Sequence, residues 1–236
     1  MTTMNDLGER LNALEPVMAA IAGRSVYVVT AAALGLTIGH NCGGFACGGL
    51  SRLVQGKLPE RFTDDRAAIV LNERQFRQES DFDSDDERYL NAILAHELAH
   101  CCDMWPGPLP VYPASAASIA VEVQSQVALT PRDWHGPNLP KWFGHEERFL
   151  RALCHVQHRM ECIGLPVDSY LAFPDDYYDL DRFECYVENL RCEMASRQGE
   201  PISEILKSEP PKLFTELWQV DSGPGRAMLL AAGPSL

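Results

Sequence analysis

Apolar residues recur every three or four positions near the start of the chain, which is the spacing of one helix face. These residues are Leu7, Leu11, Leu14, Met18 and Ile21. The pattern predicts an amphipathic helix that opens the chain. Pro16 lies inside this pattern, so we expect it to kink the helix or to start a second piece.

Two short segments are rich in β-branched and apolar residues and predict strands. The first is SVYVVTAA, residues 25–32, and the second is AIVLN, within residues 66–76. Between them, the stretch GHNCGGFACGGL at residues 39–50 contains five glycines, which favours a loop over a regular element.

A third pattern marks the start of a helix at Ser84. The sequence Ser-Asp-Asp-Glu at residues 84–87 matches a capping box, in which the serine and glutamate side chains satisfy amides at a helix N-terminus. Apolar residues at Leu90, Leu94 and Leu98 continue the helical spacing. We expect this helix to end near Trp105, ahead of Pro106.

The second half of the chain predicts helices separated by a long connection. Residues 106–140 are rich in proline and predict a surface connection or insertion. Helical patterns follow at residues 144–164 and 180–197, with shorter ones near residues 202–209 and 212–220. We expect residues 222–236 to form a frayed tail. The whole chain, 1–236, then predicts a single, helix-rich α+β domain with a small sheet.

Composition and charge exclude some classes of function. The hydrophobic content is 46%, typical of a globular protein, and the formal net charge is −13. Such an acidic chain is a poor candidate for binding nucleic acid. The start MTTMNDLGER does not resemble a secretion signal, and no apolar run is long enough to span a bilayer. We therefore expect a cytoplasmic protein that binds neither nucleic acid nor membrane.

The cysteines show no C-x-x-C pair, and in a chain of this length they are typical of reduced core thiols. There are eight of them, at positions 42, 47, 101, 102, 154, 162, 185 and 192. Cys185 and Cys192 are two turns apart on one helix face, which predicts core packing. Cys101 and Cys102 are adjacent in the sequence. Three roles are open for them, which are core packing, metal binding and a response to oxidation.

The predicted helix from Ser84 contains the sequence HELAH at residues 96–100. Residues four apart share a helix face, so His96 and His100 can present imidazole nitrogens to one metal ion. Glu97 is rotated by about 100° from His96, which places its carboxylate beside the metal. There it can take a proton from a water molecule that the metal activates. The motif predicts a Zn²⁺ site with Glu97 as the catalytic base.

The sequence LAHELAH, after a strand and an acidic capped turn, resembles the active-site helix of zincin-type metallopeptidases. The nearest pattern is that of small SprT-like and phage-associated bacterial zincins, and the resemblance covers residues 66–160. It implies a zincin-like fold, peptide-bond hydrolysis and a peptide or protein substrate. It also implies that AIVLN is the edge strand that pairs with an extended substrate.

A zinc enzyme of this kind needs a third ligand, and several residues compete for that role. The metzincin extension is absent. His145 is preferred, because HEERF resembles the H-G-x-x-F string around the third histidine of SprT-like proteins, although Glu146 stands where that string has glycine. His135, which is followed by glycine, is the alternative. A carboxylate remains open, and the candidates are Glu146, Glu147, Glu184 and Glu188.

Supporting residues are less clearly marked. Asp103, one turn beyond His100, either accepts a hydrogen bond from a ligand imidazole or is a surface residue. Tyr170, Tyr177 and Tyr178 are candidates for stabilising a tetrahedral oxyanion. Besides a peptidase, the chain fits a catalytically silent zincin-fold binding or scaffold protein. A helical interaction module without metal is the third possibility.

Overall fold

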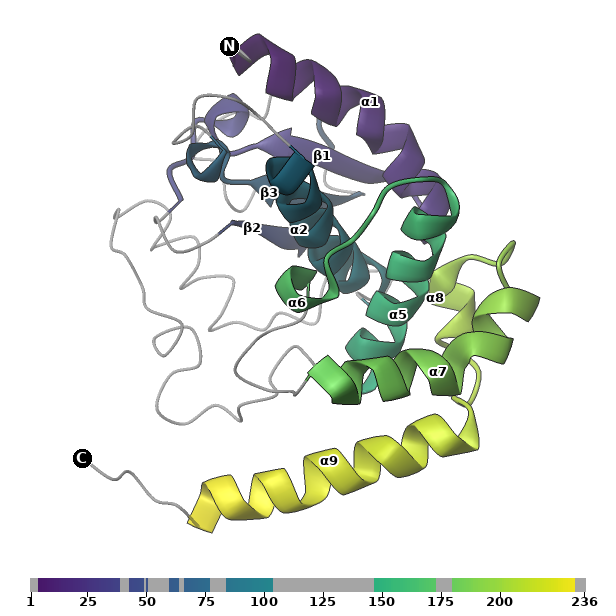
Figure 1. Cartoon of the computed structure of the whole chain (residues 1–236). Helices are drawn as coiled ribbons and strands as arrows, with labels where there is room; N and C mark the ends of the chain where they lie inside the picture. The colour runs from purple at the N-terminus through teal and green to yellow at the C-terminus, as the bar shows by residue number, and fades with distance from the viewer. Residues whose placement is uncertain are drawn as a thin grey trace.

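The computed structural model describes residues 4–38, 43–48, 50, 60–63, 66–76, 84–103, 147–172 and 180–231. Within these residues the protein is α+β and rich in helices, with one three-stranded sheet. Figure 1 shows the sheet beside α1 and α2, and α9 as the element farthest from it. The predicted fold class is confirmed at this level.

The order of elements follows the hydrophobic pattern closely. The strands are β1 Val26–Thr30, β2 Gly44–Gly48 and β3 Ala67–Leu71. The helices are α1 Met4–Ala22, α2 Ser84–Asp103, α5 Glu147–Cys162, α6 Ser169–Ala172, α7 Leu180–Ser196, α8 Ile202–Ile205 and α9 Lys212–Ala231. Two 3₁₀ turns, η1 Ala32–Leu34 and η3 Glu73–Gln75, follow β1 and β3. Pro16 lies inside α1, which continues past it as one helix.

The sheet separates two apolar clusters because strand side chains alternate between its faces. Val28 and Ile69 face the larger cluster, which α1, α2 and α5 complete. Tyr27 and Val70 face a smaller cluster on the other side, together with Phe45. β1 pairs with β3 in parallel, and β2 pairs with β3 antiparallel. Both faces of the central strand are therefore buried, which explains its uninterrupted apolar sequence.

The sheet corrects two expectations about its strands. The segment AIVLN forms β3, which is the central strand and not the edge strand, because β2 pairs along its other side. β2 comes from the glycine-rich stretch, which was predicted to be a loop. A Cβ atom at Gly43 would lie 2.5 Å from the Ile93 side chain of α2, and one at Gly44 would lie 3.2 Å from it. The glycines let an edge strand run close beneath a helix.

The C-terminal end of α2 is held by two arginines from other parts of the chain. Arg24 donates to the carbonyl of Cys101 at 3.1 Å, and Arg148 donates to the Asp103 carboxylate at 2.8 Å. Carbonyl groups at a helix end lack intrahelical partners and carry partial negative charge, so cations are favourable there. These contacts fix the end of the helix that carries the HELAH motif.

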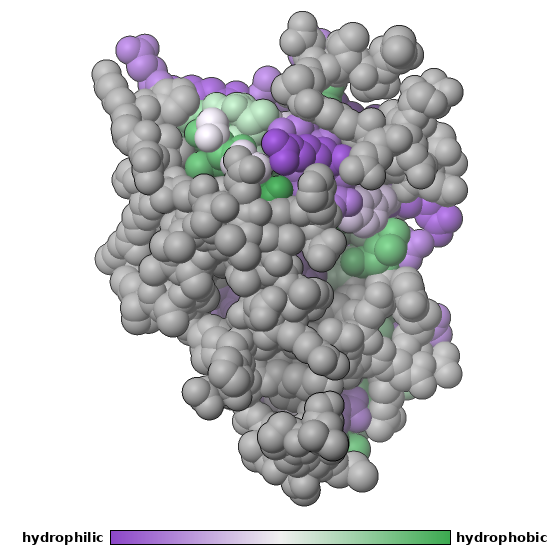
Figure 2. All heavy atoms as spheres, turned by 90° about the vertical axis from the view of Figure 1, so that its left-hand side faces the viewer, coloured by the Kyte–Doolittle hydropathy of each residue, from purple (hydrophilic) through white to green (hydrophobic). Residues whose placement is uncertain are grey.

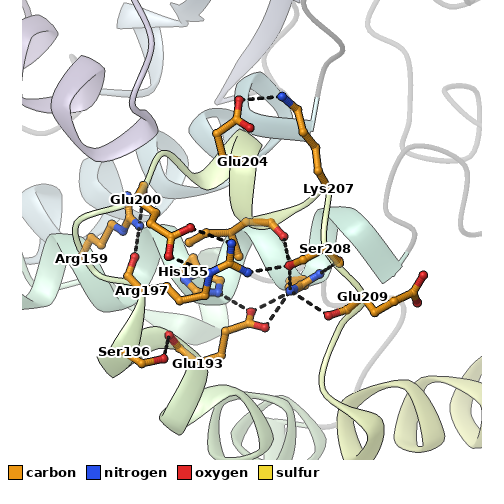
Figure 3. Close-up of polar contacts among 12 residues, drawn as sticks. His155, Arg159, Glu193, Ser196, Arg197, Glu200, Glu204, Lys207, Ser208 and Glu209 are labelled. Atoms are coloured by element: carbon orange, nitrogen blue, oxygen red, sulfur yellow. Dashed lines mark hydrogen bonds and ion pairs between the residues drawn. The ribbon is translucent and has the colours of Figure 1, made fainter.

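A cluster of largely buried charged side chains fixes α5 to its neighbours (Figure 3). We call it the arginine cluster, and it consists of Arg151, His155, Arg159 and Glu193. Arg151 donates two hydrogen bonds to Glu193, at 2.9 and 2.7 Å, and another to the carbonyl of Ser208. His155 lies 2.8 Å from the same carboxylate. Arg159 donates to the carbonyls of Ile21 and Arg197. The cluster thus joins α5 to α1, to α7 and to the turn after α8.

Two further expectations differ from the structure. The backbone of residues 222–231 continues α9, where a frayed tail was predicted; residues 226–231 are mostly strong helix formers. Cys185 and Cys192 are exposed on α7, and not in the core, because the buried face of that helix is formed by Phe183, Tyr186 and Leu190. The proline-rich segment 106–140 lies outside the described residues.

The described surface is mixed in character. On the face shown in Figure 2, apolar residues lie in separate groups beside hydrophilic ones. The exposed large apolar side chains among the described residues come from several elements and are Ile163, Leu171, Leu213 and Val220. In the described part of the chain, none of the helices combines the length and apolar character that crossing a membrane requires.

Candidate metal centre

The two histidines of the HELAH motif converge on one face of α2, as their spacing predicts. The distance from His96 Nε2 to His100 Nε2 is 3.2 Å, and both side chains are half-buried. Two nitrogens held by one tetrahedral zinc ion at about 2.0–2.1 Å lie about 3.3 Å apart. The pair is therefore spaced as two ligands of a single zinc ion would be.

The tautomer of His96 is set by a backbone group. Its Nδ1 atom lies 2.9 Å from the carbonyl oxygen of Ala172, at the end of α6. A carbonyl only accepts hydrogen bonds, so Nδ1 carries the proton and Nε2 keeps its lone pair directed at His100. Burial lowers the pKa of His96, against the hydrogen bond to Ala172, which raises it. The neutral ring is the form that binds a metal ion.

One aromatic ring packs against both imidazoles. The Phe149 ring centroid lies 4.3 Å from that of His100 and 5.0 Å from that of His96. Phe149 is in the first turn of α5 and is 1% exposed. Packing of this kind restricts ring rotation, so α5 contributes directly to the orientation of the pair. The sequence offered one signal for this role, since an aromatic residue at this point is part of the SprT-like string.

Glu97 lies at the outer edge of the sheet. Asn72 donates to the carbonyl of Gly43, so residues 43 and 72 form a hydrogen-bonded pair of the β2–β3 ladder. Such pairs alternate in an antiparallel ladder, so the amide of Ala46 points away from β3. That amide donates to the Glu97 carboxyl. Nothing in the sequence pointed to Ala46, because a backbone donor can be supplied by almost any residue.

Burial has a strong effect on the acidity of Glu97. The residue is 8% exposed, and burial raises its pKa to about 8, although the Ala46 hydrogen bond lowers it. Without a metal ion, the group is thus mostly protonated at neutral pH. A dication bound beside it would favour the carboxylate, because opposite charges a few ångströms apart stabilise each other.

The third ligand is not settled by the described residues. Within them, no third histidine, cysteine, aspartate or glutamate joins His96 and His100 in a group that could hold a metal ion. Glu147 instead accepts a hydrogen bond from Thr215, and Glu188 pairs with Arg191. His145, His135 and Glu146 lie outside the described residues. So do Tyr177, Tyr178 and the side chain of Tyr170.

Asp103 has a different partner from the one expected of a group that orients an imidazole. Its carboxylate accepts a hydrogen bond from Arg148, and Arg148 also donates to the carbonyl of Leu206. The orienting role at His96 belongs to the carbonyl of Ala172 instead. Asp103 therefore ties the end of α2 to α5 and to the residue after α8.

The neighbouring thiols are poor metal ligands in this setting. Cys101 and Cys102 are both buried, and burial raises the pKa of Cys101 well above its ordinary value and that of Cys102 to about 12. Metals bind the thiolate, which is scarce at neutral pH when the pKa is so high. The two cysteines pack in the core, which is one of the three interpretations of the sequence.

The centre thus combines two converging imidazoles, a backbone acceptor that selects the tautomer of one of them, and a buried carboxyl beside an edge strand. These parts fit a zinc ion that is completed by a further ligand. Comparison with family models, curated proteins and solved structures gives no match to this chain.

Proposed function

We propose that the protein is a zinc-dependent peptidase of the zincin type, in which His96, His100 and His145 hold zinc and Glu97 is the general base. The observation that carries the proposal is the 3.2 Å approach of the two Nε2 atoms, with the proton of His96 held at Nδ1 by Ala172. A surface histidine pair has no need of a fixed tautomer, whereas a metal ligand does.

His145 is the proposed third ligand because of its distance along the chain. It precedes Glu147, the first residue of α5, by two residues, and two residues span at most about 7 Å. The first turn of α5 reaches the histidine pair through Phe149. A histidine so close in sequence to that turn is better placed for the role than His135, ten residues further back.

In the proposed reaction the residues of the chain handle protons. Zinc supplies a Lewis acid that lowers the pKa of a water molecule to about 7 and polarises a carbonyl group. Glu97 accepts the proton that the attacking water releases and delivers it to the leaving amine. The Ala46 amide holds the Glu97 carboxyl in place for both transfers.

Peptide as the substrate class is supported by the position of β2. Its residues Gly44, Ala46 and Gly48 alternate with those bonded to β3, so their backbone groups point outward from the sheet, where the Ala46 amide already donates to Glu97. An extended peptide can add to such an edge as a further strand. We therefore propose that β2, and not the AIVLN segment, is the edge strand that pairs with an extended substrate. Glu97 lies beside that edge.

The alternative is a zincin-fold binding or scaffold protein that holds zinc without turnover. The burial of Glu97 favours it, because a carboxyl that is 8% exposed has little access to a water molecule or a substrate. The cytoplasmic location and the phage-associated relationship are likewise proposals that rest on the sequence.

Zinc content is the first test. Metal mass spectrometry on the wild type is expected to give about one zinc per chain, lost in His96→Ala and His145→Ala. The ion should remain in His135→Ala and in His158→Ala, a histidine of α5 that contacts Cys162. Absence of zinc from the reconstituted wild type would reject both the peptidase and the scaffold.

Peptide cleavage then separates the two zinc-binding functions. A library of unstructured peptides is incubated with the wild type and with Glu97→Gln. The peptidase requires cleavage that disappears in Glu97→Gln while zinc is retained. Cleavage by neither protein, with one zinc in each, would favour the scaffold.

A further inference from the structure

The carbonyl that holds His96 belongs to a helix of a single turn. Asp168 caps the start of α6, since its backbone oxygen accepts from the Ala172 amide at 2.9 Å and its carboxylate accepts from the Leu171 amide at 3.3 Å. Carbonyls at a helix end have no partner within the helix. The Ala172 carbonyl finds its partner in His96 Nδ1. Its position depends on how the segment 165–172 is held.

Side chains of α2 and α5 hold this segment. Asn91 of α2 donates from Nδ2 to the carbonyl of Pro166 at 2.9 Å. Gln157 of α5 donates to the hydroxyl of Ser169 at 2.7 Å. Arg88 approaches the Asp168 carboxylate at 3.5 Å, from a largely exposed position. Asn91 is 1% exposed and Gln157 is 8% exposed, so the two amides form the buried part of the clamp.

Asn91 makes this contact at a cost. Its Oδ1 atom is buried and has no hydrogen-bond partner within the described residues. The orientation of the amide is unambiguous, because only the NH₂ end can face a carbonyl. Leucine would pack at this buried helix position without an unsatisfied oxygen. The bond to Pro166 is therefore what an asparagine contributes here.

We infer that Asn91 is a positioning residue for the metal centre: it holds the segment 165–172 so that the Ala172 carbonyl meets His96 Nδ1 and selects the tautomer of that ring. The effect passes from Asn91 through Pro166 and α6 to His96, and Asn91 itself touches no ligand. Its consequence for zinc affinity rests on the proposed function, whereas its consequence for the tautomer does not.

The test uses two readouts on the full chain with Asn91→Leu. Nitrogen NMR of the histidine rings in the metal-free protein reports which nitrogen of His96 is protonated. In the wild type the proton should be at Nδ1, and in Asn91→Leu the two tautomers should mix. Zinc affinity, measured by competition with a chelator, should fall about 10- to 100-fold.

Matched variants separate positioning from general damage. Asn189→Leu removes a more distant amide–carbonyl bond, from Asn189 to Leu213 between α7 and α9, and should change neither readout. If Asn91→Leu does not fold, Ser169→Ala loosens the same segment by removing the acceptor of Gln157, and the same changes are expected in smaller measure.

The possible results either support or overturn the role of Asn91. A folded Asn91→Leu with the proton still at Nδ1 and zinc affinity within about twofold of wild type overturns the inference. The same holds for Ser169→Ala if it replaces Asn91→Leu. If the wild type binds no zinc, the proposed function fails, and the tautomer measurement still decides the role of Asn91.

Discussion

Two histidine sites, one buried and one half-buried, lie on neighbouring helices and differ in how their ring nitrogens are paired. His155 of the arginine cluster is 1% exposed and donates to Glu193, which also receives two hydrogen bonds from Arg151. Positive and negative groups there complement each other. His96 and His100 instead direct two nitrogens of the same kind at one point. In the first arrangement a carboxylate accepts from one nitrogen of the ring, and His155 Nδ1 has no hydrogen-bond partner within the described residues. The second arrangement is the one that fits the proposed zinc ion.

The difference shows why a histidine alone says little about function. Burial lowers the pKa of both His96 and His155. What distinguishes them is the partner of each ring nitrogen. Glu193 holds Nε2 of His155, and the Ala172 carbonyl holds Nδ1 of His96. Only His96 directs its other nitrogen at a second imidazole.

The largest expected effect comes from breaking the arginine cluster. Glu193→Leu removes the carboxylate that Arg151 and His155 share, and these side chains are only 3% and 1% exposed. Removing one partner of a buried ion pair costs about 3–5 kcal/mol, because the remaining charge is buried and uncompensated. Chemical denaturation should show this loss, with zinc content of the folded fraction unchanged.

The control for this prediction lies on the same helix. Glu188 pairs with Arg191 at side-chain exposures of 59% and 73%, so Glu188→Leu should change stability by less than about 1 kcal/mol. Equal losses in the two variants would mean that the arginine cluster contributes no more than a surface pair.

Acid should weaken the arginine cluster in two windows of pH. Burial raises the pKa of Glu193, but hydrogen bonds from His155 and Arg151 outweigh it and lower the pKa to about 2, below its ordinary 4.5. Burial lowers the pKa of His155 below 6.5, although Glu193 raises it. Below pH 6.5, and again from 4.5 down to about 2, the unfolded chain binds protons that the folded chain does not. The free energy of unfolding should therefore fall in both windows.

Urea denaturation between about pH 3 and 7 measures this dependence. In Glu193→Gln, residue 193 should no longer contribute to the loss of stability below pH 4.5, because glutamine does not titrate. A variant whose stability falls as steeply as that of wild type over this acidic window would show that other carboxylates cause the loss.

The last prediction concerns the metal side of the comparison, where a modest change in stability is expected. Phe149→Leu removes the ring that packs on both imidazoles and should cost about 1–1.5 kcal/mol, with a measurable loss of zinc affinity. Phe214→Leu, at an equally buried ring that packs on Tyr186, should cost about the same and leave zinc affinity unchanged. Equal zinc affinities in the two variants would remove the orienting role of Phe149.

Local patterns were sufficient for much of the fold and for the core of the candidate site. The spacing of apolar residues placed α1, α2, α5 and α7, because a helix face repeats every 3.6 residues whatever it packs against. The same geometry brought His96 and His100 together from their separation of four. Runs of β-branched residues located β1 and β3 for a similar reason.

Contacts between distant segments were decided only by the tertiary structure. The glycines of residues 39–50 predicted a loop, yet Gly44–Gly48 forms an edge strand, and Gly43 and Gly44 leave room for the side chain of Ile93 on α2. Phe149 and the carbonyl of Ala172 reach the histidine pair from segments that lie near it only after folding. The sequence by itself determined the helix and its two imidazoles. The tertiary structure decided what orients them, because orientation depends on backbone groups whose position no side chain reveals.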